Sequence, residues 1–169
     1  TTANNNTAVG YQAGYSNTTG DALVAVGQGA LYSNTTASDN TAVGFSAGNA
    51  VTTGTENTLI GSLAGDALTN ADGNVALGAY ALSSDTLGSD SVAIGNNALL
   101  NQNFTSATDA YNVAVGKNAG LSVTTGTRNT LIGAFAGDNL NTSEQNTAVG
   151  FEALTTEDSH GFNTAIGYQ

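Results

Sequence analysis

The chain contains no cysteine, proline, methionine or tryptophan among its 169 residues. Without cysteine it can form no disulfide, no thiolate metal site and no cysteine nucleophile. Basic residues are nearly as scarce, since only Lys117 and Arg128 stand against 13 acidic residues, for a formal net charge of −11. Proteins that bind nucleic acid or anionic membranes use clustered Lys and Arg to meet the phosphates. The composition therefore argues against both as partners.

Long apolar runs and helix-forming residues are also missing. No apolar stretch approaches the roughly 18 residues of a membrane-spanning helix, and no charged-then-apolar signal opens the chain. We therefore expect no membrane insertion by this segment. Lys, Glu and Arg are rare, and Asn, Thr and Gly interrupt every stretch, so no helical stripe at i, i+3, i+4 and i+7 can form. These absences favour an all-β fold.

What the chain has in abundance is an internal repeat, which is most regular at a glycine. Ten glycines recur every 17 residues, and the spacing widens to 21 once, between Gly95 and Gly116. A branched aliphatic residue precedes each glycine, and alanine follows the first nine by three residues, as in Ile60, Gly61 and Ala64. We interpret these glycines as structural turn residues: Gly10, Gly27, Gly44, Gly61, Gly78, Gly95, Gly116, Gly133, Gly150 and Gly167. A repeat this regular indicates a repeat protein, so the fold is considered before any functional motif.

Residues 1–169 are expected to form a single repeat array. Its units start near Asn6, Leu23, Asn40, Asn57, Asn74, Ser91, Asn112, Asn129, Asn146 and Asn163. The residue pattern of each unit predicts a strand of about four residues and a turn at the glycine. A second short extended piece and a Thr-Thr-Gly-type turn should follow. The recurring glycine predicts a positive φ or a close approach that a side chain would block. The expected fold is a repetitive β-solenoid or β-roll of about ten 17-residue coils.

Equivalent positions of successive coils should stack about 4.8 Å apart. Eight of the ten first positions are Asn, which predicts a ladder of side-chain amides that hydrogen-bond along the stack. If each coil buries one Val or Ile, two Ala and one further Leu or Val, the core of one chain is thin. Several identical chains that share an axial core would bury these residues better. We therefore expect more than one chain in the rod.

The segment Val92-Ala93-Ile94-Gly95 with Ala98, and its nine relatives, resembles the head repeats of trimeric autotransporter adhesins. In that family such segments build a left-handed β-roll shared by three chains. Arrays of the Asn-Thr-Ala-Val-Gly-Tyr-Gln-Ala type are also similar to phage tail-fibre shafts. The resemblance covers essentially the whole chain, although the adhesin heads have a shorter period. It implies a homotrimer, intertwined or side by side, in an extracellular, cell-surface or virion structure.

The function implied is a structural and adhesive segment of a fibre, without catalysis and without a cofactor. Its expected partners are further copies of the chain and a host-surface glycan or receptor. One alternative is a subunit of a self-assembling extracellular filament. A less favoured alternative is an ice-binding or surface-binding solenoid. It rests on the Thr pairs 18–19, 35–36, 52–53 and 124–125, whose rows Asn70, Leu87 and Asn141 interrupt.

Two groups of residues have the types that bind metals, but not the spacing. His160, the only histidine, follows Glu157 and Asp158 in a turn. Asp66, Asp72 and Gly73 lack the regular Asp-x-Asp-x-Asp-Gly loop of a calcium site. No Gly-x-Ser-x-Gly elbow accompanies the Ser, His and Asp residues. We therefore expect no metal site and no catalytic residues.

The one break in the rhythm lies within residues 100–111. Its four extra residues would shift every later column if they entered a coil, yet Gly116 and Ala119 resume the register. The insertion should therefore leave the coil as a loop, and insertions in repeat proteins often form the binding face. The candidate contact residues are Asn101, Asn103, Phe104 and Thr105. The alternative for Phe104 is that it folds back over the coil edge.

Overall fold

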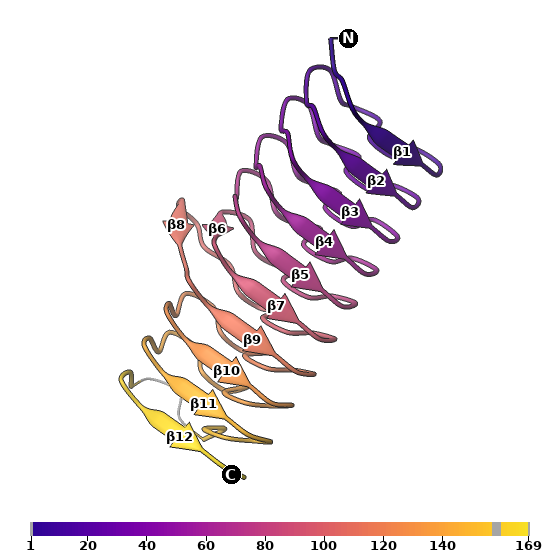
Figure 1. Cartoon of the computed structure of the whole chain (residues 1–169). Coiled ribbons are helices and arrows are strands. Elements are labelled where there is room, and N and C mark those ends of the chain that lie inside the picture. The colour runs from indigo at the N-terminus through magenta and orange to yellow at the C-terminus, as the bar shows by residue number, and fades with distance from the viewer. Residues whose placement is uncertain (1, 157–159, 169) are drawn as a thin grey trace.

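The computed structural model describes residues 2–156 and 160–168. In this part of the chain, ten short strands form one parallel sheet along a rod, and there is no helix (Figure 1). The strands are β1 (Thr7–Val9), β2 (Val24–Val26), β3 (Thr41–Val43), β4 (Thr58–Ile60), β5 (Val75–Leu77), β7 (Val92–Ile94), β9 (Val113–Val115), β10 (Thr130–Ile132), β11 (Thr147–Val149) and β12 (Thr164–Ile166). The chain is a parallel β-solenoid of about nine turns, which confirms the expected all-β repetitive class.

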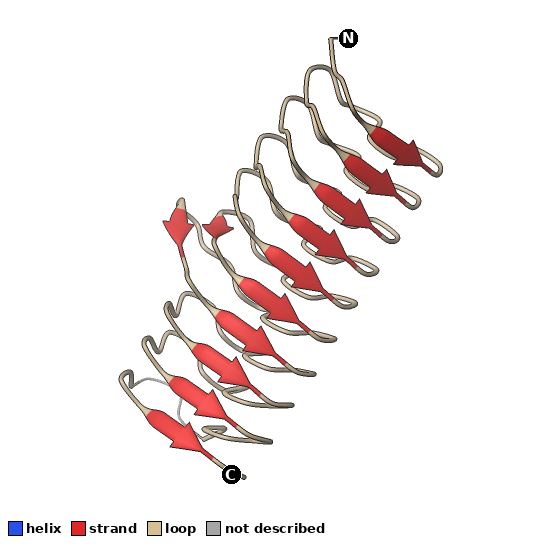
Figure 2. Cartoon of the chain, viewed as in Figure 1, coloured by secondary structure: helices blue, strands red, loops and turns tan. Residues whose placement is uncertain are grey.

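Each strand pairs with the strand of the next coil, residue opposite equivalent residue, as in Thr41 opposite Thr58 and Val43 opposite Ile60. Two further strands among the described residues, β6 (Gly88–Ser89) and β8 (Thr108–Asp109), form a separate parallel pair. Figure 2 shows this pair standing out from one side of the rod. Because consecutive strands of one chain are neighbours throughout the main sheet, the chain closes its own coils. This arrangement does not match an intertwined sheet in which strands of different chains alternate.

The second extended piece expected in each unit is absent from the described coils. After the glycine the chain makes a series of turns, because residues two and four places further on have positive φ angles. In the fourth coil these are Leu63, at 57°, and Gly65, at 55°. Such angles are incompatible with a strand. The turns still bond to the neighbouring coils, since the Gly65 N–H donates to the Ala81 carbonyl at 2.9 Å.

The turn glycines meet both parts of the expectation. Gly61 has a φ of +138°, which L-residues rarely adopt. A Cβ placed on Gly61 would lie 2.5 Å from the carbonyl oxygen of Gly78 in the next coil. The glycine column therefore lets successive coils approach each other at the corner where each strand ends.

The asparagine ladder is present. The Asn57 side chain accepts a hydrogen bond from the Asn74 backbone N–H at 3.0 Å and donates to the Ala71 carbonyl at 2.8 Å. Ala71 lies in the last turn of the same coil, so this amide joins the start of the coil to its end. The bond to the next coil is repeated by Asn6, Asn40, Asn74, Asn112, Asn129 and Asn146.

The core consists of two alanine columns with leucines between them. Seven leucines are fully buried: Leu31, Leu59, Leu68, Leu82, Leu99, Leu131 and Leu140. Where one position of the coil interior holds a leucine, the neighbouring positions hold glycine or alanine. Leu59 lies at a strand centre where Gly48 and Gly65 leave space, and a Cβ on Gly65 would lie 2.7 Å from a Leu59 methyl carbon. This interleaving of large and small residues fills the coil interior.

The aliphatic residue before each glycine does not belong to this core, which corrects the sequence-based estimate. Strand residues alternate in direction, so a buried central residue sends both neighbours outward. Leu59 is fully buried, whereas Ile60 is half-buried and Leu77 is 42% exposed. The single chain therefore encloses its own core of Ala and Leu, and a thin core is no longer an argument for several chains.

We predict that Gly61→Val lowers the free energy of unfolding by about 3 kcal/mol or more, because it combines a strained φ with a backbone clash. Ser62→Val is the matched control, since Ser62 is exposed in the same turn. Chemical denaturation of both variants measures the difference. Equal stabilities would show that the two residues have different environments from those described.

Candidate functional site

The insertion alters one corner of the sixth coil. Asn103 is still in register, since its backbone N–H donates to the Thr124 carbonyl at 2.9 Å and its side-chain oxygen accepts from Thr86 Oγ1 at 3.1 Å. Beyond it, β8 pairs with β6 three residues out of the regular register. Three of the extra residues therefore lie between Asn103 and Thr108, and the fourth lies between Asp109 and the β9 strand. We call residues 104–111 together with β6 the ledge.

The structure separates the four candidate contact residues. Asn101, Asn103 and Thr105 are exposed, but Phe104 is only 4% exposed. The aromatic ring lies over Gly88, where an added Cβ would come within 2.7 Å of the Phe104 Cδ2 atom. The alternative that Phe104 folds back is confirmed, and Phe104 is removed from the candidate contact surface. A contact role for the other three stays a prediction.

Sequence reasoning missed a buried polar group beneath the ledge. Gln102 and Asp85 are both fully buried. Gln102 Nε2 donates to Asp85 Oδ2 at 2.6 Å and to Ser91 Oγ at 3.1 Å, and its Oε1 accepts from Asn112 Nδ2 at 2.8 Å. A signal was available, because four coils have a buried Val or Leu at this interior position, namely Val51, Leu68, Val123 and Leu140. Two successive polar residues at this position, Asp85 and Gln102, can satisfy each other when they are buried.

The second candidate surface is the outer face of the main sheet. One column consists of the residue before each turn glycine: Val9, Val26, Val43, Ile60, Leu77, Ile94, Val115, Ile132, Val149 and Ile166. A parallel column of Thr and Val lies two residues earlier in each strand. Several of these side chains are exposed, such as Val9 at 58% and Ile132 at 40%. Contiguous apolar surface of this kind commonly marks an interaction site.

Aromatic side chains stack on the turns at both ends of the rod. Tyr15 and Tyr32 have parallel rings with centroids 5.3 Å apart, and Phe151 and Tyr168 are stacked at 5.7 Å. Each pair links adjacent coils. These rings add to the coil-to-coil contacts already made by the backbone.

Most carboxylates line another corner of the rod. Seven lie within three residues before a ladder position: Asp21, Asp39, Glu56, Asp72, Asp90, Asp109 and Glu144. Some of them bond to the neighbouring coil, as when Asp72 Oδ1 accepts the Thr55 N–H at 2.6 Å. Within the described residues, no group of three His, Cys, Asp or Glu is arranged to hold a metal ion. Glu157 and Asp158, considered with His160, lie outside the described residues.

The threonine rows use much of their hydrogen-bonding capacity within the coil wall. Thr18, Thr35 and Thr52 each donate the side-chain hydroxyl to the carbonyl of the equivalent residue in the next coil, at 2.8 to 3.2 Å. Fewer hydroxyl donors are left for ordering water. This geometry does not favour the ice-binding alternative.

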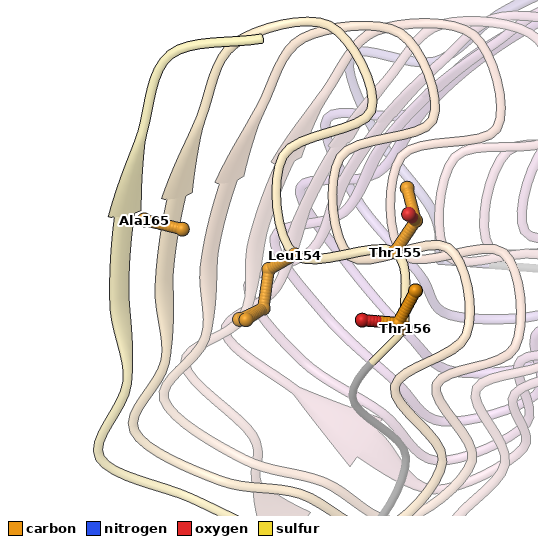
Figure 3. Close-up of a pocket in the computed structure, with 4 residues that line it drawn as sticks. All are labelled: Leu154, Thr155, Thr156 and Ala165. Carbon is orange, nitrogen blue, oxygen red and sulfur yellow. The ribbon is translucent and has the colours of Figure 1, made fainter. Parts of the chain in front are cut away.

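One hollow opens at the C-terminal end of the stack, lined by Leu154, Thr155, Thr156 and Ala165 (Figure 3). Leu154 and Ala165 belong to the interior columns, so the hollow is the open end of the coil core. Among the described residues, its lining consists of two threonine hydroxyls and two aliphatic side chains.

Comparison with protein-family models, curated proteins and solved structures found no match to this chain. Among the residues described, no helix is long and apolar enough to cross a bilayer. The resemblance to adhesin heads and tail-fibre shafts therefore stays a prediction from the repeat motif.

Two equivalent aspartates have perturbed acidity. Burial raises the pKa of Asp66 above its usual 3.8, against the lowering effect of a hydrogen bond from its own backbone N–H. Burial likewise raises the pKa of Asp138, with a smaller raising effect from the charge of Glu152. In both residues Oδ1 is buried without a hydrogen-bond partner. The ionised carboxylate is thus less favourable in the folded chain than in the unfolded chain.

We predict that Asp66→Asn with Asp138→Asn raises the melting temperature at pH 7. A raised folded pKa means that stability is lost as pH rises through that pKa, and the neutral amide removes this loss. Below pH 3.8, the ordinary aspartate value, the gain should vanish because the parent carboxyls are protonated. Asp90→Asn removes a charge from an exposed position and is the control. A gain that is independent of pH would contradict the assignment.

Proposed function

We propose that this chain is a structural and adhesive segment of an extracellular or virion fibre, in which three copies pack side by side. The observation that carries the proposal is the outer face of the main sheet. Its aliphatic column extends over all ten main-sheet strands of the described chain without a covering element. A soluble rod that leaves so regular an apolar column in water is expected to cover it with another surface.

The regularity of this face favours further copies of the same chain as its cover. Val, Ile and Leu recur in it at a constant register, because each strand pairs with its equivalent. Identical parallel chains related by rotation would bring equivalent residues together at every coil, without accumulating mismatch along the rod. The number three comes from the resemblance to trimeric adhesin heads. The side-by-side form is preferred because each chain closes its own coils.

Three further features fit a fibre segment. Backbone hydrogen bonds join every neighbouring pair of main-sheet strands along the axis, which suits a load-bearing shaft. The net charge of −11 favours solubility of a repetitive rod. The ledge interrupts an otherwise uniform side wall and offers a place for lateral contact with a host glycan or receptor. This function requires no catalytic group or cofactor.

A self-assembling filament is the second candidate. The first and last repeats begin alike, with Asn-Thr-Ala-Val-Gly-Tyr-Gln at residues 6–12 and Asn-Thr-Ala-Ile-Gly-Tyr-Gln at residues 163–169. A further copy that continues the array in the same register would extend the parallel sheet, and such a head-to-tail contact produces open filaments.

Light scattering coupled to gel filtration tests the proposal. We predict a particle of three 16.7 kDa chains, and we predict that Ile60→Lys with Ile132→Lys yields a folded monomer. Lysine ammonium groups on the aliphatic column would be desolvated in the trimer interface but hydrated in the monomer. Thr53→Lys with Thr125→Lys adds the same charge to exposed turn positions of neighbouring coils and should leave the trimer intact.

A folded parent monomer would overturn the trimer, and a mass that grows with concentration would favour the filament. Circular dichroism of each variant shows whether the coils remain folded. Dissociation by the control pair as well would mean that added charge, and not the aliphatic column, determines assembly.

A further inference from the structure

The ladder of asparagines is interrupted at Leu23 and at Ser91, and the second interruption lies at the coil that carries the insertion. Ser91 stands where Asn57 and Asn74 stand in the preceding coils. Asn74 spans its coil by donating to the Gly88 carbonyl at 2.9 Å. The serine side chain is too short to span the coil in this way, and the insertion displaces the corresponding backbone outward. The buried amide of Gln102 fills the gap, because it bonds to Ser91 on one side and to Asn112 on the other.

Asp85 connects this amide to both segments of the ledge, β6 and residues 104–111. Its Oδ1 accepts the Gly88 N–H at 3.0 Å, at the start of β6, and the Phe104 N–H at 3.1 Å, where the insertion begins. Its Oδ2 accepts the Gln102 amide. The carboxylate is fully buried and satisfied by these donors. A polar network with every member bonded fixes the backbone that it holds.

The ledge is therefore anchored from below in two ways. The polar network holds its backbone at Gly88 and Phe104, and the buried Phe104 ring packs over Gly88. A surface held in this way loses little conformational freedom when a ligand binds, which favours affinity.

The exposed chemistry on and beside the ledge is polar and mostly uncharged. Asn101 and Asn103 offer amides, and Thr105 and Ser106 offer hydroxyls. Tyr111 adds an aromatic ring that is 50% exposed, with its hydroxyl 3.4 Å from Asp109 Oδ2. Amides, hydroxyls and an aromatic ring are groups that can bond to sugar hydroxyls and pack against the apolar face of a sugar ring.

The charges around the ledge restrict the ligand further. The negative charges of Asp109 and Asp90 raise the pKa of the Tyr111 hydroxyl, and the positive charge of Arg128 in the next coil lowers it. Two carboxylates against one guanidinium, in a chain of net charge −11, disfavour an anionic ligand. Residues 105–109, of which Thr108 is half-buried and the others are exposed, contain no large apolar side chain, which disfavours a hydrophobic protein partner.

We propose that the ledge is a preformed binding site for an uncharged saccharide, and that Asp85 and Gln102 are its positioning residues. This inference rests on the proposed attachment function and names its ligand class. The saccharide meets the exposed amides and hydroxyls, while the buried pair acts only by holding the ledge backbone in place.

Binding of the intact chain to neutral oligosaccharides, and to sialylated and sulfated derivatives of the same sugars, tests the proposal. We expect binding to neutral sugars only, and a loss of about tenfold or more in Asn103→Ala with Thr105→Ala, at unchanged melting temperature. Asn141→Ala with Thr142→Ala is the matched control, because Asn141 is exposed at the same repeat position two coils further on. The control should bind like the parent.

Gln102→Leu tests the positioning role separately. We expect weaker binding together with faster amide hydrogen exchange at Phe104 and Thr108–Ala110, while the main-sheet amides stay protected. Unchanged exchange at the ledge would overturn the positioning role. If this variant does not fold, the Asn103 and Thr105 pair still decides whether the ledge binds sugar.

Preferential binding of anionic sugars, equal losses in the control, or no binding of any neutral sugar would overturn the saccharide site. A trimer that binds no sugar would leave the fibre segment standing and reject this inference. A monomer that binds neutral sugar through the ledge would support the saccharide site and reject the trimeric fibre segment.

Discussion

The structure depends on one interaction, the hydrogen bonding of an asparagine amide that closes most of the coils. The strands of the main sheet are only three residues long, too short to hold a coil together by themselves. The Asn57 side chain adds hydrogen bonds beyond those of the strands, because it bonds to Ala71 at the far end of its own coil and to Asn74 in the next coil. The two bonds set the size of the coil and its register on its neighbour.

A coil closed in this way has little room inside, and the packing follows from that limit. The interior accepts alanine in two columns and one larger aliphatic group beside a glycine, as Leu59 does beside Gly65. The β-branched residues of the strands lie on the outer face of the sheet, as Thr58 and Ile60 do, and they form the surface on which the proposed assembly rests. The ledge obeys the same constraint, since a buried glutamine restores the missing ladder contact where the coil is widened.

The sequence predicts the glycine, alanine and asparagine columns because each needs one residue type at one place. The outward direction of Ile60 could also have been predicted from the sequence, because Ile60 is next to the inward-pointing Leu59 in a strand. The positive φ angles at Leu63 and Tyr80 were not, because bulky residues seldom adopt them and their identities vary between coils. Of the candidate contact residues, the sequence located the insertion but not the burial of Phe104, which depends on the space above Gly88.

The most direct test of the ladder is the free energy of unfolding of Asn57→Ala compared with Asn70→Ala. Asn57 is fully buried and bonds to two coils, whereas Asn70 is exposed in a turn. Removing Asn57 leaves the Asn74 N–H and the Ala71 carbonyl buried without these partners, so we predict a loss of about 3 kcal/mol. For Asn70→Ala we predict a change within about 0.5 kcal/mol. Similar losses for the two variants would contradict the claim that the buried amides hold the coils closed.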